Sequence, residues 1–244
     1  EEIQPSTRKY PGIIFKQNRE VGDQILTVED LEFKTADGAY LFKDVNFTVN
    51  KGDKIAFVSR NTLALNTLFK ILWDGQKASK GKINWGVTVT MSYLPNENAE
   101  YFEEKNNLVD WLRDFSTEKD ETYIRGFLGR MLFSGEETQK MATVLSGGEK
   151  VRCMLSKMML EEPNVALFDE PTNHLDLESI QALNNGMKDY AGVVLFHSHD
   201  QEVMNSIANR IIEITPNGMI DKYMNYEEYA ESSEIKERRN ELYA

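Results

Sequence analysis

The stretch VALFDEPTNHLD at residues 165–176 decides the fold of this 244-residue chain. Its first residues, 165–168, are apolar and predict a buried parallel strand, with Asp169 and Glu170 at the carboxyl end. Buried like charges repel each other, so this pair needs a compensating cation, whereas an accidental strand end with two surface acids would not. Because successive strand side chains point to opposite faces, we expect one carboxylate to hold hydrated Mg²⁺ and the other to orient a water toward a γ-phosphate.

Helices and strands alternate around and after this stretch. We predict helices at about 147–160, 177–190 and 201–208, and strands at about 165–168, 193–196 and 210–214. This alternation predicts parallel βαβ units, whose ligands bind at the carboxyl ends of the strands.

The first half of the chain predicts an antiparallel region and a helical insertion. Residues 25–33 and 40–49 alternate apolar and polar side chains around Asp37-Gly38, a hairpin turn signal. The stretch at about 97–150 instead carries apolar residues at helical spacing. The predicted fold class is therefore α/β, with a core of parallel strands, an antiparallel β subdomain and an inserted helical subdomain.

The same patterns predict the domain limits. We expect a linker or wrapping arm at residues 1–22, one two-lobed domain at 23–230, and a charged helix or tail at 231–244. The chain starts at Glu1 without Met, which favours a piece of a longer protein.

Composition narrows the possible functions. The chain is 41% hydrophobic, and no apolar run approaches the roughly 20 residues that cross a bilayer. Its net charge of −12 argues against a broad nucleic-acid-binding face, although Arg8-Lys9 or the group Lys236, Arg238 and Arg239 could make a local RNA contact. Cys153 is the only cysteine, so we expect a buried structural thiol, no disulfide partner and a cytoplasmic location.

Two interpretations are open for LSGGEK at residues 145–150. Ser146 and Glu149 have the spacing of a capping box, which by itself only starts a helix. Gly147 and Gly148 would also let backbone N–H groups approach phosphate oxygens at the amino end of a helix.

A second polar segment, HSHD at residues 197–200, comes directly after the apolar run 193–196. A histidine just past such a strand end could contact a γ-phosphate, while Asp200 is placed to cap the next helix. The two roles are compatible.

Together, LSGGEK, the stretch 165–176 and Ser198-His199-Asp200 resemble, in order and spacing, the signature loop, the Walker B motif with D-loop, and the switch histidine of P-loop NTPases of the ABC type. The sequence EPTNHLD at residues 170–176 resembles the corresponding motif of the ABC-F class, whose members carry two such domains in one chain and no membrane part. The resemblance covers about residues 24–229, and STRKYP at 6–11 is similar to the segment directly after the interdomain linker of that class. It therefore implies the second, C-terminal ATPase domain of a two-domain protein.

The resemblance also implies residue roles. Asp169 resembles the Mg²⁺-associated aspartate, Glu170 the catalytic base and His199 the γ-phosphate switch. Asp176 resembles the D-loop aspartate that contacts the opposite domain. In this family the sites form between two domains packed head to tail. The signature that binds the partner's nucleotide corresponds to Ser146, Gly147, Gly148 and Glu149.

The phosphate loop departs from the family pattern Gly-x-x-x-x-Gly-Lys-Ser/Thr. After a strand at 54–58, residues 59–67 read SRNTLALNT, with no glycine and no lysine. Leu65 in the lysine position removes a charged hydrogen bond worth about 1.5–3 kcal/mol, and Thr62 and Ala64 would have to adopt any positive-φ positions. The degenerate loop comprises Asn61, Thr62, Leu63, Ala64, Leu65, Asn66 and Thr67.

Further substitutions affect the same nucleotide side. Asn66 offers Mg²⁺ an amide oxygen in place of the usual hydroxyl, and Thr67 keeps a hydroxyl for the α-phosphate. Asn96 stands where the family has a metal-associated glutamine, one methylene longer. All these departures concern the domain's own nucleotide, whereas the signature loop that serves the partner's nucleotide is intact.

Two hypotheses account for this contrast. In the first, the domain is an ATPase half that forms composite ATP and Mg²⁺ sites with another ABC domain, in the same chain or in a homodimer mate, and keeps Glu170 and His199 for hydrolysis. In the second, it is a catalytically inactive scaffolding half that only supplies its signature loop to the partner site. The ATPase subunit of an ABC transporter is a third alternative. The first hypothesis predicts weak, micromolar-to-millimolar ATP binding by this domain, and the second predicts no detectable ATP binding by the isolated chain. The resemblance implies a ribosome-associated role, either as a translation factor or in antibiotic protection.

Overall fold

Strands with period-2 apolar patterns and helices with amphipathic patterns form two compact units in the computed structural model, which describes residues 10–244. The sheet-rich unit comprises Arg19–Tyr93, Asn164–Asp169 and Gly192–Ala244, and the helical unit comprises residues 10–18, Leu94–Pro163 and Glu170–Ala191. The predicted α/β fold class, with an antiparallel sheet and helical elements, is confirmed. Residues 1–9 of the predicted linker or arm at 1–22 lie outside the described residues.

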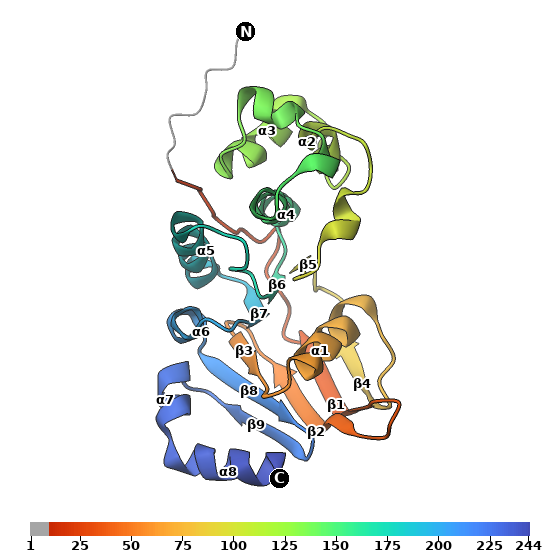
Figure 1. The fold of residues 1–244 in the computed structure, drawn as a ribbon, viewed down its shortest axis with the longest axis vertical. Coiled ribbons are helices and arrows are strands. Elements are labelled where there is room, and N and C mark those ends of the chain that lie inside the picture. The colour runs from red at the N-terminus through yellow and green to blue at the C-terminus, as the bar shows by residue number, and fades with distance from the viewer. Residues whose placement is uncertain (1–9) are drawn as a thin grey trace. The chain divides into compact units, whose positions relative to one another are not determined.

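Both sheets belong to the sheet-rich unit (Figure 1). The strands are β1 (Leu26–Lys34), β2 (Tyr40–Val49), β3 (Lys54–Val58), β4 (Lys80–Trp85), β5 (Met91–Leu94), β6 (Val165–Asp169), β7 (Val193–His197), β8 (Arg210–Thr215) and β9 (Gly218–Lys222). An antiparallel sheet has the order β2-β1-β4, and the larger sheet has the order β5-β6-β7-β3-β8-β9. Strands β6, β7, β3 and β8 run parallel, which confirms the predicted βαβ core, while β9 pairs antiparallel with β8.

The helices fall in the predicted segments. They are α1 (Thr62–Asp74), α2 (Leu108–Arg113), α3 (Glu121–Arg130), α4 (Gly147–Glu161), α5 (Leu177–Asp189), α6 (Gln201–Ile207), α7 (Tyr226–Glu231) and α8 (Ser233–Tyr243), with short 3-10 turns η1 (Ala99–Phe102), η2 (Gly135–Gln139) and η3 (Ala142–Val144). The charged pattern of residues 226–244 predicts one helix, but the structure divides it into α7 and α8. Ser232 has extended dihedral angles, and its side chain accepts the Ile235 N–H to cap α8.

The core of the sheet-rich unit fills the space between its sheets and α1. Helix α1 buries one apolar face, and its Phe69 ring meets Phe57 of β3 edge-on, with ring centroids 6.0 Å apart. The Phe57 ring in turn packs against the Phe47 ring of β2, with ring centroids 5.7 Å apart. The register of α1 is therefore set by apolar packing on the strand that precedes it.

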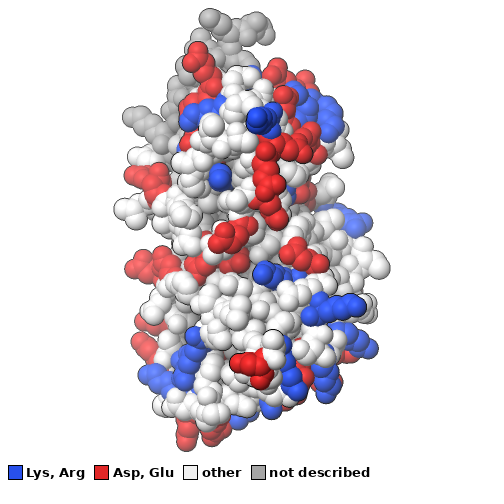
Figure 2. Space-filling view, turned by 45° about the vertical axis from the view of Figure 1, so that its right-hand side comes forward, with Lys and Arg blue, Asp and Glu red and all other residues white. Residues whose placement is uncertain are grey.

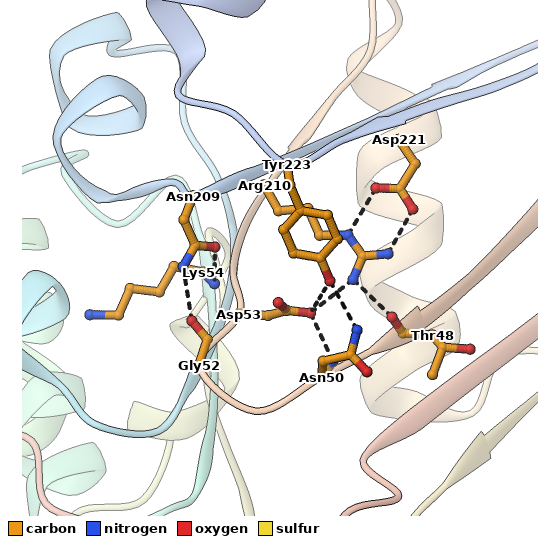
Figure 3. Close-up of polar contacts among 9 residues, drawn as sticks. All are labelled: Thr48, Asn50, Gly52, Asp53, Lys54, Asn209, Arg210, Asp221 and Tyr223. Carbon is orange, nitrogen blue, oxygen red and sulfur yellow. Dashed lines mark hydrogen bonds and ion pairs between the residues drawn. The ribbon is translucent and has the colours of Figure 1, made fainter.

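A buried ionic network fixes the amino end of β3 (Figure 3). The Arg210 guanidinium forms two hydrogen bonds with the Asp221 carboxylate, at 2.8 and 2.6 Å, and one of 2.8 Å with Asp53. It also donates to the Thr48 carbonyl at 2.8 Å, and Tyr223 donates to Asp53 at 3.3 Å. Arg210 and Asp53 are each 3% exposed, so their charges are compensated inside the fold and not in water.

The helical unit packs α2, α3 and α4 against one another, and residues 10–18 run across α5. A Cβ on Gly186 of α5 would lie 2.7 Å from the Ile13 side chain, so glycine permits this close approach. Phe15 meets Tyr190 edge-on at 6.0 Å. Cys153 is fully buried, as predicted, and burial raises the pKa of its thiol.

Candidate functional site

The connection from β3 to α1 is shorter than a phosphate loop. Only residues 59–61 separate Val58 from Thr62, where α1 begins. The sequence predicts that Thr62 and Ala64 adopt any positive-φ positions of the loop, but both are helical, and no residue of 59–67 has positive φ. A glycine-free sequence has extended the helix at the expense of the loop.

Apolar packing takes the central residues of this segment into the core. Ala64, Leu65 and Thr67 are buried, at 0%, 4% and 5% exposure. Leu65, which stands in the lysine position, belongs to the core cluster that α1 shares with the strands. Thr62 and Leu63 face solvent and Asn66 is half-buried. The side chain at position 65 therefore stabilises the fold and supplies no charge for phosphate.

Backbone N–H groups of the connection are already engaged. The Asn61 N–H donates to Ser59 Oγ at 3.2 Å, and the Leu63 N–H donates to Asn61 Oδ1 at 3.0 Å. The Ala64 N–H donates to the Asn61 carbonyl at 3.0 Å, and the Arg60 N–H donates to Tyr243 Oη at 3.0 Å. A phosphate cradle needs such donors turned toward an anion. In this structure these four donors, two in the connection and two in the first turn of α1, are satisfied within the protein.

Asp169 ends β6 beside His197, the residue paired with it in β7. His197 Nε2 lies 2.5 Å from Asp169 Oδ1, and the Tyr93 hydroxyl lies 3.4 Å from Asp169 Oδ2. The Phe69 ring meets the His197 ring edge-on, with centroids 5.6 Å apart. Sequence reasoning missed His197, although the signal was present: it extends the apolar run 193–196 as the last residue of a buried strand.

Glu170 leaves the strand, which corrects the prediction that the two carboxylates alternate along it. The strand ends at Asp169, and Glu170 has φ 50°, in the left-handed region. The side-chain directions of Asp169 and Glu170 therefore depend on this turn and not on strand alternation. Glu170 is 7% exposed, so the fold keeps a carboxylate buried directly after β6.

Mg²⁺ was the expected cation at these carboxylates, with Asn66 and Asn96 as further ligands. Among residues 10–244, no group of three or more His, Cys, Asp or Glu side chains could hold a metal ion. One oxygen of Asp169 lies 2.5 Å from His197 Nε2. Asp169 and Glu170 are therefore the buried carboxylates present for a cation here, without a third His, Cys, Asp or Glu ligand in the described residues.

His199 is exposed just past the end of β7. Its ring centroid lies 6.2 Å from that of His197. Asp200 accepts the N–H groups of Glu202 and Val203, which confirms the prediction that it caps α6.

The signature segment, in the helical unit, keeps its predicted geometry. Ser146 Oγ accepts the Glu149 N–H at 3.2 Å, and Glu149 accepts the Ser146 N–H at 3.1 Å, which confirms the capping box of α4. Lys140 lies 2.7 Å from the Glu149 carboxylate. Hydrogen bonds from Lys140 and then Ser146 lower the pKa of Glu149.

Gly147 and Gly148 have an additional structural reason within the helical unit. A Cβ on Gly148 would lie 2.7 Å from the His174 carbonyl oxygen, and one on Gly147 would lie 3.2 Å from the His174 ring. His174 itself has φ 67°. The paired glycines therefore let the segment after the carboxylates pack directly onto the start of α4.

Two further predicted site residues of the helical unit, Asp176 and Asn96, form hydrogen bonds with residues 173–179. Asp176 caps α5 by accepting the Ser179 N–H at 2.8 Å, and this bonding to Ser179 lowers its pKa. Asn96 accepts a hydrogen bond of 3.0 Å from the Asn173 side chain. Asn96 therefore contacts the chain just after the acidic pair.

A parallel sheet with carboxylates at a strand end, together with a capped glycine helix start, defines an α/β ATP-binding domain. The sequence profile described as ABC transporter matches residues 42–173. The chain belongs to this family of ATP-binding domains, whose members bind ATP with Mg²⁺.

Three relatives illustrate the similarity. The chain is 54% identical over its whole length to the "Uncharacterized ABC transporter ATP-binding protein YkpA" of Bacillus subtilis, of which it covers 45%. It is 30% identical to "ABC transporter F family member 5" of Arabidopsis thaliana, over 98% of this chain and 34% of that protein. It is also 30% identical to the "Energy-dependent translational throttle protein EttA" of Haemophilus influenzae, over 86% of this chain and 38% of that protein. The chain thus spans less than half the length of each.

Solved structures agree on the fold. The dimeric ATP-binding cassette MJ0796, bound to ADP and Pi, superimposes with a TM-score of 0.67 at 15% identity, over 82% of this chain and 99% of that chain. Within residues 10–244, none of the helices combines the length and the apolar character that a membrane crossing requires.

Proposed function

We propose that this chain is one ATP-binding half of an ABC-F protein and that it supplies its signature loop to the nucleotide held by a partner ABC domain. The observation that carries this proposal is the contrast between two helix starts. The start of α4 has two glycines and a capping box, whereas the start of α1 has no glycine and buries Leu65 in the lysine position. The partner is a second ABC domain in the same chain or in a homodimer mate, and the location is cytoplasmic.

The ABC-F assignment rests on EPTNHLD at residues 170–176 and on relatives that include an ABC transporter F family member. We prefer it to an ABC transporter subunit for this reason. The chain would form the C-terminal of two ATPase domains, with the segment before β1 as the end of an interdomain linker.

The test is ATP hydrolysis by the two-domain protein with Ser146→Arg. A bulky cation at the signature should reduce turnover by roughly 10-fold or more, the factor that about 1.4 kcal/mol represents. Thr117→Arg, at an exposed position of the same unit, is the matched control and should leave turnover unchanged. Unchanged turnover in Ser146→Arg would contradict the proposal.

An active ATPase half is a second candidate, because the fold retains Asp169, Glu170 and His199 at the ends of β6 and β7. Here Glu170 acts as the base and His199 contacts the γ-phosphate. Glu170→Gln separates the candidates: it should abolish turnover at this domain's site if the half is active, and should leave turnover intact if only the signature is used.

We further propose that the ATP cycle acts on the ribosome in translation, in keeping with the name of the related translational throttle protein. Lys and Arg side chains on the face in Figure 2 are interspersed with Asp and Glu, so this face is not broadly basic. Arg239 pairs with Glu213 at 2.7 Å and Arg238 with Glu241 at 3.0 Å, so the proposed local RNA contacts are Arg8-Lys9 and the exposed Lys236. Co-sedimentation of the two-domain protein with ribosomes tests this proposal. If the ATP-bound protein did not co-sediment with ribosomes, the proposal would be wrong.

A further inference from the structure

The C-terminal helix α8 reaches back to the connection between β3 and α1, within the sheet-rich unit. The Arg60 N–H donates to Tyr243 Oη at 3.0 Å. The Arg60 side chain donates to Asn240 Oδ1 at 3.3 Å, and its guanidinium carbon lies 4.3 Å from the centroid of the Tyr243 ring. Both the backbone and the charge of Arg60 are thus held by α8.

The buried Glu213 carboxylate binds two side chains of α8, Tyr243 and Arg239. Glu213 of β8 is 0% exposed and is paired in register with Val58, the last residue of β3. Tyr243 and Tyr229 each donate to the Glu213 carboxylate at 2.6 Å, and Arg239 Nε lies 2.7 Å from it. Burial and then Glu213 raise the pKa of Tyr243 to about 12, so the neutral phenol donates to Glu213 and accepts from Arg60 at physiological pH.

The attachment of α8 is mostly polar. Only Ile235 and Leu242 of its residues are buried, and the Asn217 side chain holds its end by donating to the Leu242 carbonyl at 2.8 Å. An isolated helix of this length is marginal in water, so α8 depends on these contacts and on Glu213. Arg60 and Asn240 are exposed, so this part of the contact can exchange with solvent or with an anion.

Of the engaged N–H groups at the connection, three are bonded locally and one, that of Arg60, is bonded to a segment 183 positions away. A local bond moves with the connection itself. The long-range bond can be broken by moving α8 alone, and this movement also frees the guanidinium. The connection is therefore coupled to the state of the C-terminal helix.

We propose that α8 is a self-inhibitory clamp on the connection 59–61, and that its release frees the Arg60 guanidinium and N–H for nucleotide phosphates. The clamp would regulate the nucleotide site of this chain itself, not the partner's site. It rests on the proposed function in one respect: the connection 59–61 is taken as part of this chain's own nucleotide site. Docking of α8 and binding of a nucleotide exclude each other, so each must weaken the other by the same factor.

The first test is calorimetric titration of the 244-residue chain with ATP and Mg²⁺. Tyr243→Phe removes the acceptor of the Arg60 N–H, and Asn240→Ala removes the acceptor of its guanidinium while leaving Glu213 untouched. Each should tighten ATP binding by about 2- to 10-fold, the equivalent of one hydrogen bond. Arg238→Ala, on the same helix, contacts Glu241 and should bind ATP as the unmodified chain does.

The second test is the reciprocal effect. Saturating ATP should increase hydrogen exchange of amides in residues 233–244 of the unmodified chain, and Arg238→Ala should show the same increase. Equal ATP affinity in all four proteins, absence of ATP binding even in Asn240→Ala, or unchanged exchange in α8 would each overturn the clamp. Failure here would leave the signature proposal intact, because Ser146→Arg is measured on the partner's nucleotide in the two-domain protein.

Discussion

Helices α1 and α4 both start with a side-chain cap but have different surroundings. Asn61 caps α1 by accepting the Leu63 N–H, and Ser146 caps α4 by accepting the Glu149 N–H. At α4 two glycines come after the cap, and the backbone of His174 packs on them. At α1 the cap leads into a helix whose inner face is buried. The comparison teaches that glycines persist where another backbone approaches, and that apolar side chains fill a helix start where no such approach is made.

The largest effect is expected from restoring the lysine that the loop lacks. Leu65→Lys places an ammonium where a 4%-exposed side chain packs in the core. We expect the free energy of unfolding to fall by at least about 2 kcal/mol, because the ammonium would be buried in the core. We expect no tight ATP binding, because residues 62–67 are helical and do not form a phosphate loop. Urea unfolding and ATP titration of the same variant measure both effects.

Leu63→Lys is the control for this variant. Leu63 lies on the outer face of α1 at 52% exposure, so the change should alter the free energy of unfolding by less than about 0.5 kcal/mol. If Leu65→Lys were as stable as Leu63→Lys and bound ATP tightly, the buried arrangement of α1 would be wrong.

A smaller effect is expected at the glycines of α4. Gly148→Ala would place Cβ 2.7 Å from the His174 carbonyl oxygen, so the backbone must shift. We expect a loss of about 1–3 kcal/mol in the free energy of unfolding, measured by thermal denaturation. Gly126→Ala, in α3 with no atom within 4 Å of the added Cβ, should instead gain roughly 0.5–1 kcal/mol. A stabilised Gly148→Ala would contradict the close contact with His174.

The smallest effects are expected at the caps, and they should be similar. Asn61→Ala and Ser146→Ala each remove one side-chain acceptor, which should lower the free energy of unfolding by about 0.5–2 kcal/mol. Asn61→Gly should cost only a few tenths of a kcal/mol by the same scale. Thermal unfolding of the three variants checks this, and equal losses for Asn61→Ala and Asn61→Gly would show that Asn61 acts through more than its cap.

Much of the fold could be predicted from the sequence because its signals are local. Apolar runs ending at Asp169 and His197, and caps at Ser146 and Asp200, placed the strands and helices within a few residues of their positions. The antiparallel strand β9 and the break at Ser232 were missed. The first has a mixed burial pattern, and the second depends on a serine that could equally continue a helix.

The candidate site was predictable in composition but not in geometry. Its residues of the helical unit, such as Ser146 and Asp176, carry capping signals that can be read from neighbouring residues. The contacts of Asp169 with His197, and of Arg60 with Tyr243, join segments far apart in the chain. No local pattern specifies such pairs.

The sequence by itself determined that this chain is an α/β ATP-binding domain with an intact signature and a phosphate loop without glycine or lysine. It could do so because motif spacing and apolar periodicity are properties of neighbouring residues. Only the tertiary structure decided what replaces the loop. Helix α1 begins at Thr62 with Leu65 buried, and Asn61 caps it by accepting the Leu63 N–H. Before the helix, the Arg60 N–H is satisfied by Tyr243 because long-range folding brings α8 to it.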